Sequence, residues 1–110
     1  MSDITEVMQT LERLNAALHD LQVRGLRVCG PEHLKSLRAI HLVLHRIEAS
    51  YVAGRLSALI SAIEADERGA AQELLRTQAA LRLFERVLTL RAAEFVLQAA
   101  VAEKASENDE

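Results

Sequence analysis

The chain has 110 residues, half of them apolar but only 3% aromatic, and a formal net charge of −3. Its single cysteine excludes an intrachain disulfide and a cysteine-based zinc site, and its slight negative charge disfavours a nucleic-acid partner. Few aromatic residues, four glycines and one proline favour helices built on Leu and Ala over β-strands.

The first predicted element is a helix over about residues 3–24. Its apolar residues alternate three and four positions apart over three heptads, as in a coiled-coil seam. They are Ile4, Val7, Leu11, Leu14, Leu18 and Leu21. Gly25 follows at the position where a glycine commonly ends a helix. We therefore expect this helix to pack against other helices along one narrow face.

Pro31 opens the second predicted helix, over about residues 31–65, because proline is favoured in the first turn of a helix. After Gly54 the apolar face moves by about a third of a turn. Two readings fit this shift, a continuous helix that bends near Gly54 or a helix that breaks there. We favour the bent helix, since one glycine costs a helix only about 1 kcal/mol.

The third predicted helix covers about residues 69–104 and carries apolar residues on two roughly opposite sides, at about 100° of rotation per residue. The first stripe comprises Leu74, Leu81, Phe84, Leu88, Phe95, Ala99 and Ala102. The second stripe comprises Leu83, Val87, Leu90, Leu97 and Val101. We expect the first stripe to pack against the two preceding helices. The second stripe then needs another helix or another chain.

These elements predict an all-α fold, an antiparallel bundle of three long helices in a single domain over residues 1–105, followed by a flexible acidic tail over 106–110. The first helix is too short to cover the other two. We therefore expect dimerisation to complete the bundle. The predicted interface of this homodimer is the second stripe, Leu83, Val87, Leu90, Leu97 and Val101.

One group of side chains suggests a metal site. His41, His45 and Glu48 are spaced four and three residues apart, which places them on one helical face. Two imidazoles and a carboxylate are suitable ligands for a divalent metal ion. The alternative is that they border the apolar stripe in water or at an interface. Apart from this possible metal ion, we expect no cofactor.

A second group is basic. Arg27, Lys35 and Arg38 surround the start of the second helix, where free backbone N–H groups favour anions. These residues form a candidate anion-binding site. The competing interpretation is a solvated positive face that complements acidic residues of a partner subunit.

The sequence contains no motif for catalysis or for nucleotide binding. Cys29 has no base and orienting group arranged to activate it, so we expect it to pack as a small apolar residue. No apolar stretch approaches the ~18 residues of a membrane span, and the N-terminal residues do not resemble a signal peptide. We expect a cytoplasmic protein, and the excess of Arg over Lys is common in proteins encoded by GC-rich bacterial genomes.

The chain is thus expected to be a non-enzymatic helical module with a protein partner, such as an adaptor, a chaperone-like factor or a small regulatory subunit. The alternative function is a sensor of a small ligand or metal ion. It would use the face of His41, His45 and Glu48 or the basic segment around Pro31.

Overall fold

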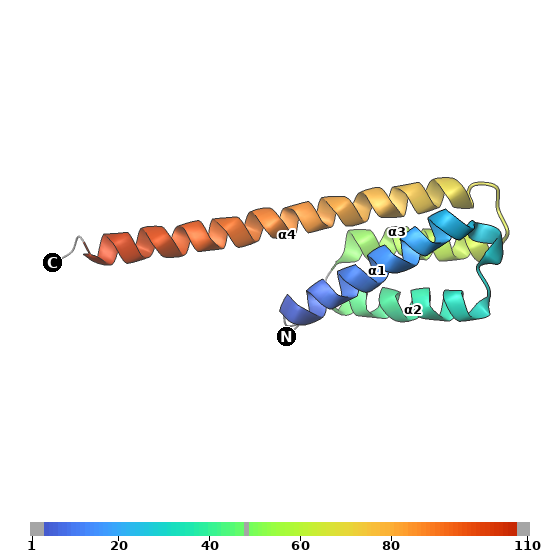
Figure 1. Ribbon diagram of the computed structural model, residues 1–110, viewed down its shortest axis with the longest axis horizontal. Helices are drawn as coiled ribbons and strands as arrows, with labels where there is room; N and C mark the ends of the chain where they lie inside the picture. Colours follow the sequence, from blue (N-terminus) through green and yellow to red (C-terminus); the bar gives the residue numbers. More distant parts are fainter. Residues whose placement is uncertain (1–3, 48, 108–110) are drawn as a thin grey trace.

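The computed structural model describes residues 4–47 and 49–107, which form helices joined by short connections, with no strand in these two ranges. The elements are α1 (Ile4–Arg24), the short 3₁₀ helix η1 (Leu26–Val28), α2 (Pro31–Arg46), α3 (Ser50–Glu64) and α4 (Ala70–Glu107). The prediction of an all-α fold is confirmed. Figure 1 shows the α-helices running alternately in opposite directions, as short connections require.

The predicted count of three long helices and the favoured bend near Gly54 are wrong, because the segment after Pro31 forms two helices. The alternative of a break is correct, but the break lies between Arg46 and Ser50 and not near Gly54. The chain leaves the helical path after Arg46 and resumes it at Ser50, where α3 turns back along α2 (Figure 1). The Ala49 amide donates a hydrogen bond to the Leu44 carbonyl and closes the end of α2. The apolar face shifts because the chain reverses direction, and Gly54 lies within α3.

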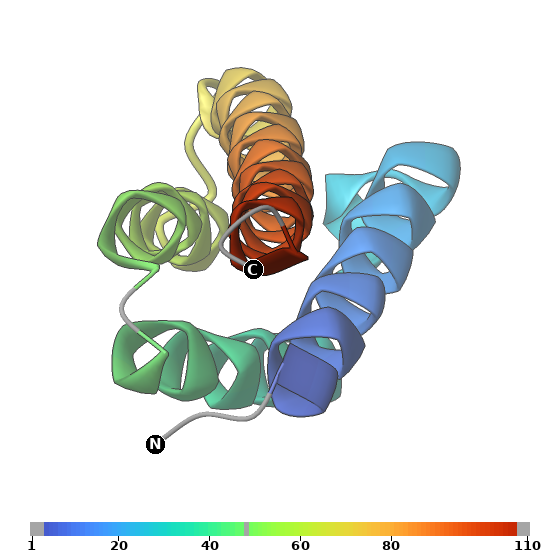
Figure 2. The same cartoon turned by 90° about the vertical axis from the view of Figure 1, so that its left-hand side faces the viewer.

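The core lies between the four helices, with α4 seated on α3, α2 beside α3, and α1 crossing both α2 and α4 (Figure 2). The coiled-coil-like seam of α1 points into this core. Leu11, Leu14, Leu18 and Leu21 are buried, Val7 is half-buried, and Ile4 at the start remains exposed. Packing within the chain therefore uses most of the seam.

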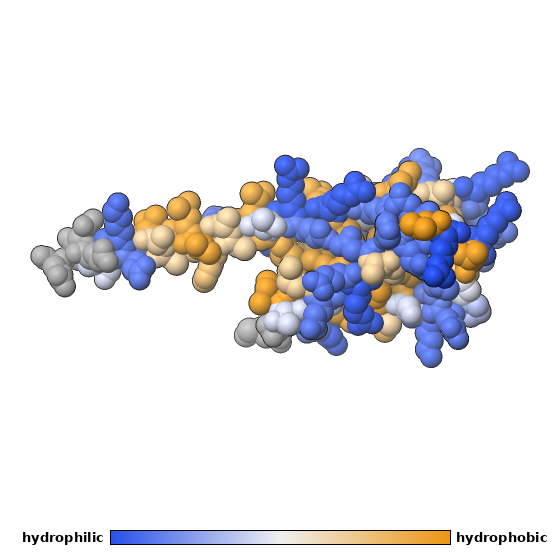
Figure 3. Space-filling model, viewed as in Figure 1, coloured by the Kyte–Doolittle hydropathy of each residue, from blue (hydrophilic) through white to orange (hydrophobic). Residues whose placement is uncertain are grey.

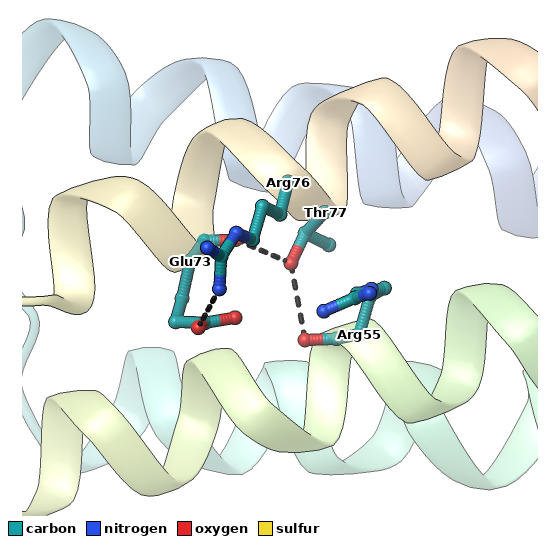
Figure 4. Close-up of polar contacts among 4 residues, drawn as sticks. All are labelled: Arg55, Glu73, Arg76 and Thr77. Carbon is teal, nitrogen blue, oxygen red and sulfur yellow. Dashed lines mark hydrogen bonds and ion pairs between the residues drawn. The ribbon is translucent and has the colours of Figure 1, made fainter.

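A buried threonine marks the close approach of α3 and α4 (Figure 4). The Thr77 hydroxyl lies 2.8 Å from the Glu73 carbonyl of its own helix and 3.1 Å from the Arg55 carbonyl of α3. One turn away, Arg76 forms an ion pair with Glu73 at 3.0 Å. Because the contact with the Arg55 carbonyl joins α4 to the backbone of α3, it helps to fix the position of the first half of α4 on the bundle.

The molecule is elongated, with principal extents of 67 × 23 × 20 Å. Its radius of gyration is 18.0 Å, whereas a compact chain of this length has about 13 Å. Figure 1 shows the cause, because α4 continues well beyond the ends of the other helices. It ends at Glu107, beyond the predicted end near 104, and residues 108–110 of the predicted tail lie outside the described residues.

Gly25 ends α1 as predicted, and its backbone φ of 91° with ψ of 155° is nearly restricted to glycine. We expect Gly25→Ala to lower the free energy of unfolding by about 1–3 kcal/mol. Gly54→Ala is the matched control, since Gly54 is exposed in the middle of α3 and an added methyl meets nothing within 4 Å. That change should raise stability by up to about 1 kcal/mol. Urea unfolding at one protein concentration measures the change in the free energy of unfolding for both variants. Changes of the same sign in the two variants would contradict this account.

Candidate interaction surface

The second half of α4 extends out of the core of the bundle. Leu88 is its last half-buried residue, and every residue from Thr89 to Ser106 is exposed. We refer to residues 89–106 as the overhang, which spans about 27 Å at 1.5 Å per residue. More than half of its residues are apolar, and Figure 3 shows hydrophobic side chains along it. An exposed apolar surface of this kind is typical of an interaction site.

The first stripe packs against the bundle only along its first half. Leu74 and Leu81 are buried, and Phe84 and Leu88 are half-buried. Phe95 is 73% exposed, and the rest of the stripe is exposed as well. The expectation that earlier helices cover the whole stripe is therefore wrong beyond Leu88. The reason is length, because the other three helices end before α4 does.

The second stripe faces away from the bundle along most of its length. Leu83, Leu90, Leu97 and Val101 are 57%, 64%, 64% and 60% exposed, respectively, and Val87 is half-buried. The structure describes a single chain, so the predicted homodimer interface stays a prediction. The chain itself leaves this stripe uncovered.

A shallow groove of about 220 Å³ lies between α3 and α4 at the start of the second stripe. It is lined by Leu83 and Ala79 of α4 and by Tyr51 of α3, among others. Tyr51 is 61% exposed, and the Arg55 guanidinium stacks 5.6 Å from its ring centre. The groove therefore extends the apolar surface of the second stripe onto α3.

A larger groove, of about 570 Å³, lies on the other side of α4, between α4 and the start of α1. Its lining is mostly apolar and includes Ile4, Met8 and Leu88, but it also contains the carboxylates Glu12 and Glu85. Sequence reasoning missed this groove. The sequence places Ile4 in the seam of the first helix. Nothing in the spacing of the residues shows that the first turns of α1 lie beside the start of the overhang.

Two of the three predicted metal ligands, His41 and His45, lie within the described residues. His41 is half-buried and His45 exposed on α2, whereas Glu48 lies outside the described residues. Within residues 4–47 and 49–107, no cluster of three or more His, Cys, Asp or Glu side chains is placed to hold a metal ion. The three-residue site stays a prediction, and titration with Zn²⁺ tests it.

The three predicted anion-binding residues are spread over two elements. Arg27, in η1, lines a cavity of about 430 Å³ that it shares with Asp66 and Glu67. Arg38 forms an ion pair with Glu64 of α3, and Lys35 is exposed on α2. Since acidic side chains of the same chain lie beside Arg27 and Arg38, the surroundings resemble internal charge pairing more than an anion site.

Cys29 lies after η1, half-buried against the core. Burial raises the pKa of its thiol above the ordinary value, because the thiolate loses solvation. A raised pKa leaves less thiolate at neutral pH and so a weaker nucleophile. The position agrees with the packing role expected from the sequence.

Comparisons of the chain with models of known families, with curated proteins and with solved structures found no match. Among the helices of the described residues, none combines the length and the apolar character needed to cross a membrane. Inferences about function therefore rest on the residues and surfaces of this chain.

Proposed function

We propose that the protein is a non-enzymatic helical interaction module that self-associates through α4 and presents the resulting assembly to a protein partner. It would serve as an adaptor, a chaperone-like factor or a small regulatory subunit in the cytoplasm. The observation that carries this proposal is the overhang, an apolar helix that the rest of the chain leaves uncovered.

Physical chemistry supports a covered overhang. Most of the stability of a helix in a protein comes from the packing of its apolar face, and each exposed leucine would gain about 1.5–3 kcal/mol on full burial. The overhang adds no stability to the four-helix bundle while its apolar side chains remain in water. An interface that buries the second stripe would account for both the length and the apolar composition of the overhang.

The molar mass of the intact chain tests the proposal. Sedimentation equilibrium at micromolar concentration should give twice the 12.2 kDa of one chain, or more. Dissociation should appear on dilution, as mass action requires for an associating protein. A single species of one-chain mass throughout the micromolar range would rule out self-association as the function of α4.

A further inference from the structure

The second stripe is symmetric about one residue of α4. Leu83 and Val101 are each nine residues from Ala92, and Val87 and Leu97 are each five residues from it. The intervals along the stripe are four, three, seven and four residues, which is the four-three pattern of a coiled-coil seam with one position skipped between Leu90 and Leu97. Read in either direction, the stripe therefore presents apolar residues five and nine positions from Ala92, and only Leu90 lacks an apolar counterpart.

Glu94 completes this seam, since it lies midway between Leu90 and Leu97 in the heptad pattern. Leu90 and Glu94 are each two residues from Ala92. Both Glu94 and the neighbouring Arg91 are exposed. A partner helix that covers the stripe must therefore accommodate one carboxylate within an otherwise apolar seam, beside one guanidinium at its edge.

From these features, and resting on the proposed self-association, we infer that a second copy of this chain covers the second stripe with its own α4, antiparallel and centred on Ala92. In this arrangement Leu83 of one copy lies opposite Val101 of the other, and Val87 lies opposite Leu97. Glu94 of one copy lies opposite Leu90 of the other copy. Measured along the helix axis, it is also within about 1.5 Å, the rise of one residue, of Arg91 of that other copy. Two equivalent Glu94–Arg91 pairs then flank the twofold axis.

The charges disfavour the parallel alternative. In a parallel pair, equivalent seam positions face each other, so the two Glu94 carboxylates would meet in the interface, where like charges are costly. Slipping the antiparallel pair by one heptad sets Val87 opposite Lys104 or Leu83 opposite Glu94, which replaces apolar pairs by unpaired charges. The register centred on Ala92 retains every apolar pair and gives each carboxylate a cation.

The groove beside α1 is a poorer site for the second copy. An antiparallel helix that placed Val96 opposite Leu88 in this groove would bring Glu103 within about one helical turn of Glu85. Glu12 lines the same groove, so three carboxylates would gather there. In the pair formed through the second stripe, by contrast, Glu94 of one copy lies beside Arg91 of the other.

Thiol cross-linking tests the orientation directly, with two single-cysteine variants made in a Cys29→Ala background. In the antiparallel pair, the Ala93 positions of the two copies lie on the same edge of the seam, within about 3 Å along the axis. The Leu97 positions lie about 15 Å apart along the axis. In a parallel pair the Leu97 positions face each other and the Ala93 positions lie on opposite edges.

We expect a short bismaleimide to link two chains of Ala93→Cys and not of Leu97→Cys. The reverse pattern would overturn the inference in favour of a parallel pair. If neither variant is linked while its sedimentation mass is still that of a dimer, the register is wrong but the proposed function stands. If neither is linked and the mass is that of one chain, both proposals fail.

A charge exchange gives an independent test of the Glu94–Arg91 pairs. Glu94→Arg alone and Arg91→Glu alone should each weaken dimerisation about tenfold or more, because each places like charges beside the axis. The double variant exchanges both charges and should return the dissociation constant to near that of the unchanged chain. Additive losses in the double variant would contradict the pairing. Glu103→Arg, on the opposite face of the overhang, is the matched control and should leave dimerisation unchanged.

Discussion

Leu90→Glu combined with Leu97→Glu is expected to abolish self-association while leaving the four-helix bundle folded. Both side chains are 64% exposed in the single chain, so the bundle does not depend on them. If a partner covers them, each burial contributes about 1–2 kcal/mol, and a symmetric dimer contains each position twice. The loss of about 4 kcal/mol or more corresponds to about a thousandfold rise in the dissociation constant.

The matched control for this variant is Ala92→Glu combined with Ala99→Glu. These two residues are also seven positions apart in the overhang and are exposed, but they lie on the side of the first stripe. The control introduces the same charges into the same helix and should retain the dimer. Sedimentation and circular dichroism of both variants measure mass and helicity. Complete unfolding of Leu90→Glu/Leu97→Glu would instead assign the second stripe to the core of the single chain.

Leu56→Ala is expected to cost about 3–5 kcal/mol of the free energy of unfolding, the range for a buried leucine whose removal leaves a cavity. Leu56 is 0% exposed in α3, within the core. A domain of this size has about 5–15 kcal/mol of total stability, so the variant should be close to unfolding at physiological temperature. Because dimerisation adds to apparent stability, the comparison needs equal protein concentrations.

Leu42→Ala is the matched control for the core variant. Leu42 is 71% exposed on α2, and surface substitutions usually change stability by about 0.5 kcal/mol or less. Urea denaturation of the two variants separates the roles of the two leucines. A similar loss in both would contradict the arrangement of α2 and α3 described above.

The class of the fold and much of its core could be predicted from the sequence. Regular apolar spacing identified the seam of α1, and Gly25 and Pro31 marked the end of one helix and the start of the next. These features depend on local periodicity and on the backbone preferences of single residues. They therefore need no knowledge of the tertiary structure.

The reversal between α2 and α3 could not be predicted in the same way. The residues at the break are ordinary helix formers such as Ile47 and Ala49, while the stronger signal, Gly54, lies inside α3. A shifted apolar face has the same appearance whether a helix bends or the chain turns back. The choice is made by tertiary packing, because folding α3 back onto α2 buries both faces.

The candidate interaction surface could be predicted in part. The second stripe was recognisable as an apolar face without an internal partner, whereas the exposure of Phe95 was not. The extent of the overhang depends on where the other helices end in space. Once the second long helix is divided in two, the bundle is too short to cover the first stripe beyond Leu88.

Hydrogen exchange of the overhang, measured by mass spectrometry at several protein concentrations, tests the central claim most directly. If a second copy covers α4, the amides of residues 89–106 should exchange more slowly as concentration rises, because protection follows the population of the dimer. The amides of α2 and α3 that exchange through local opening should show no such dependence. Fast exchange across the overhang at every concentration would contradict the account, since the helix would then remain uncovered in solution.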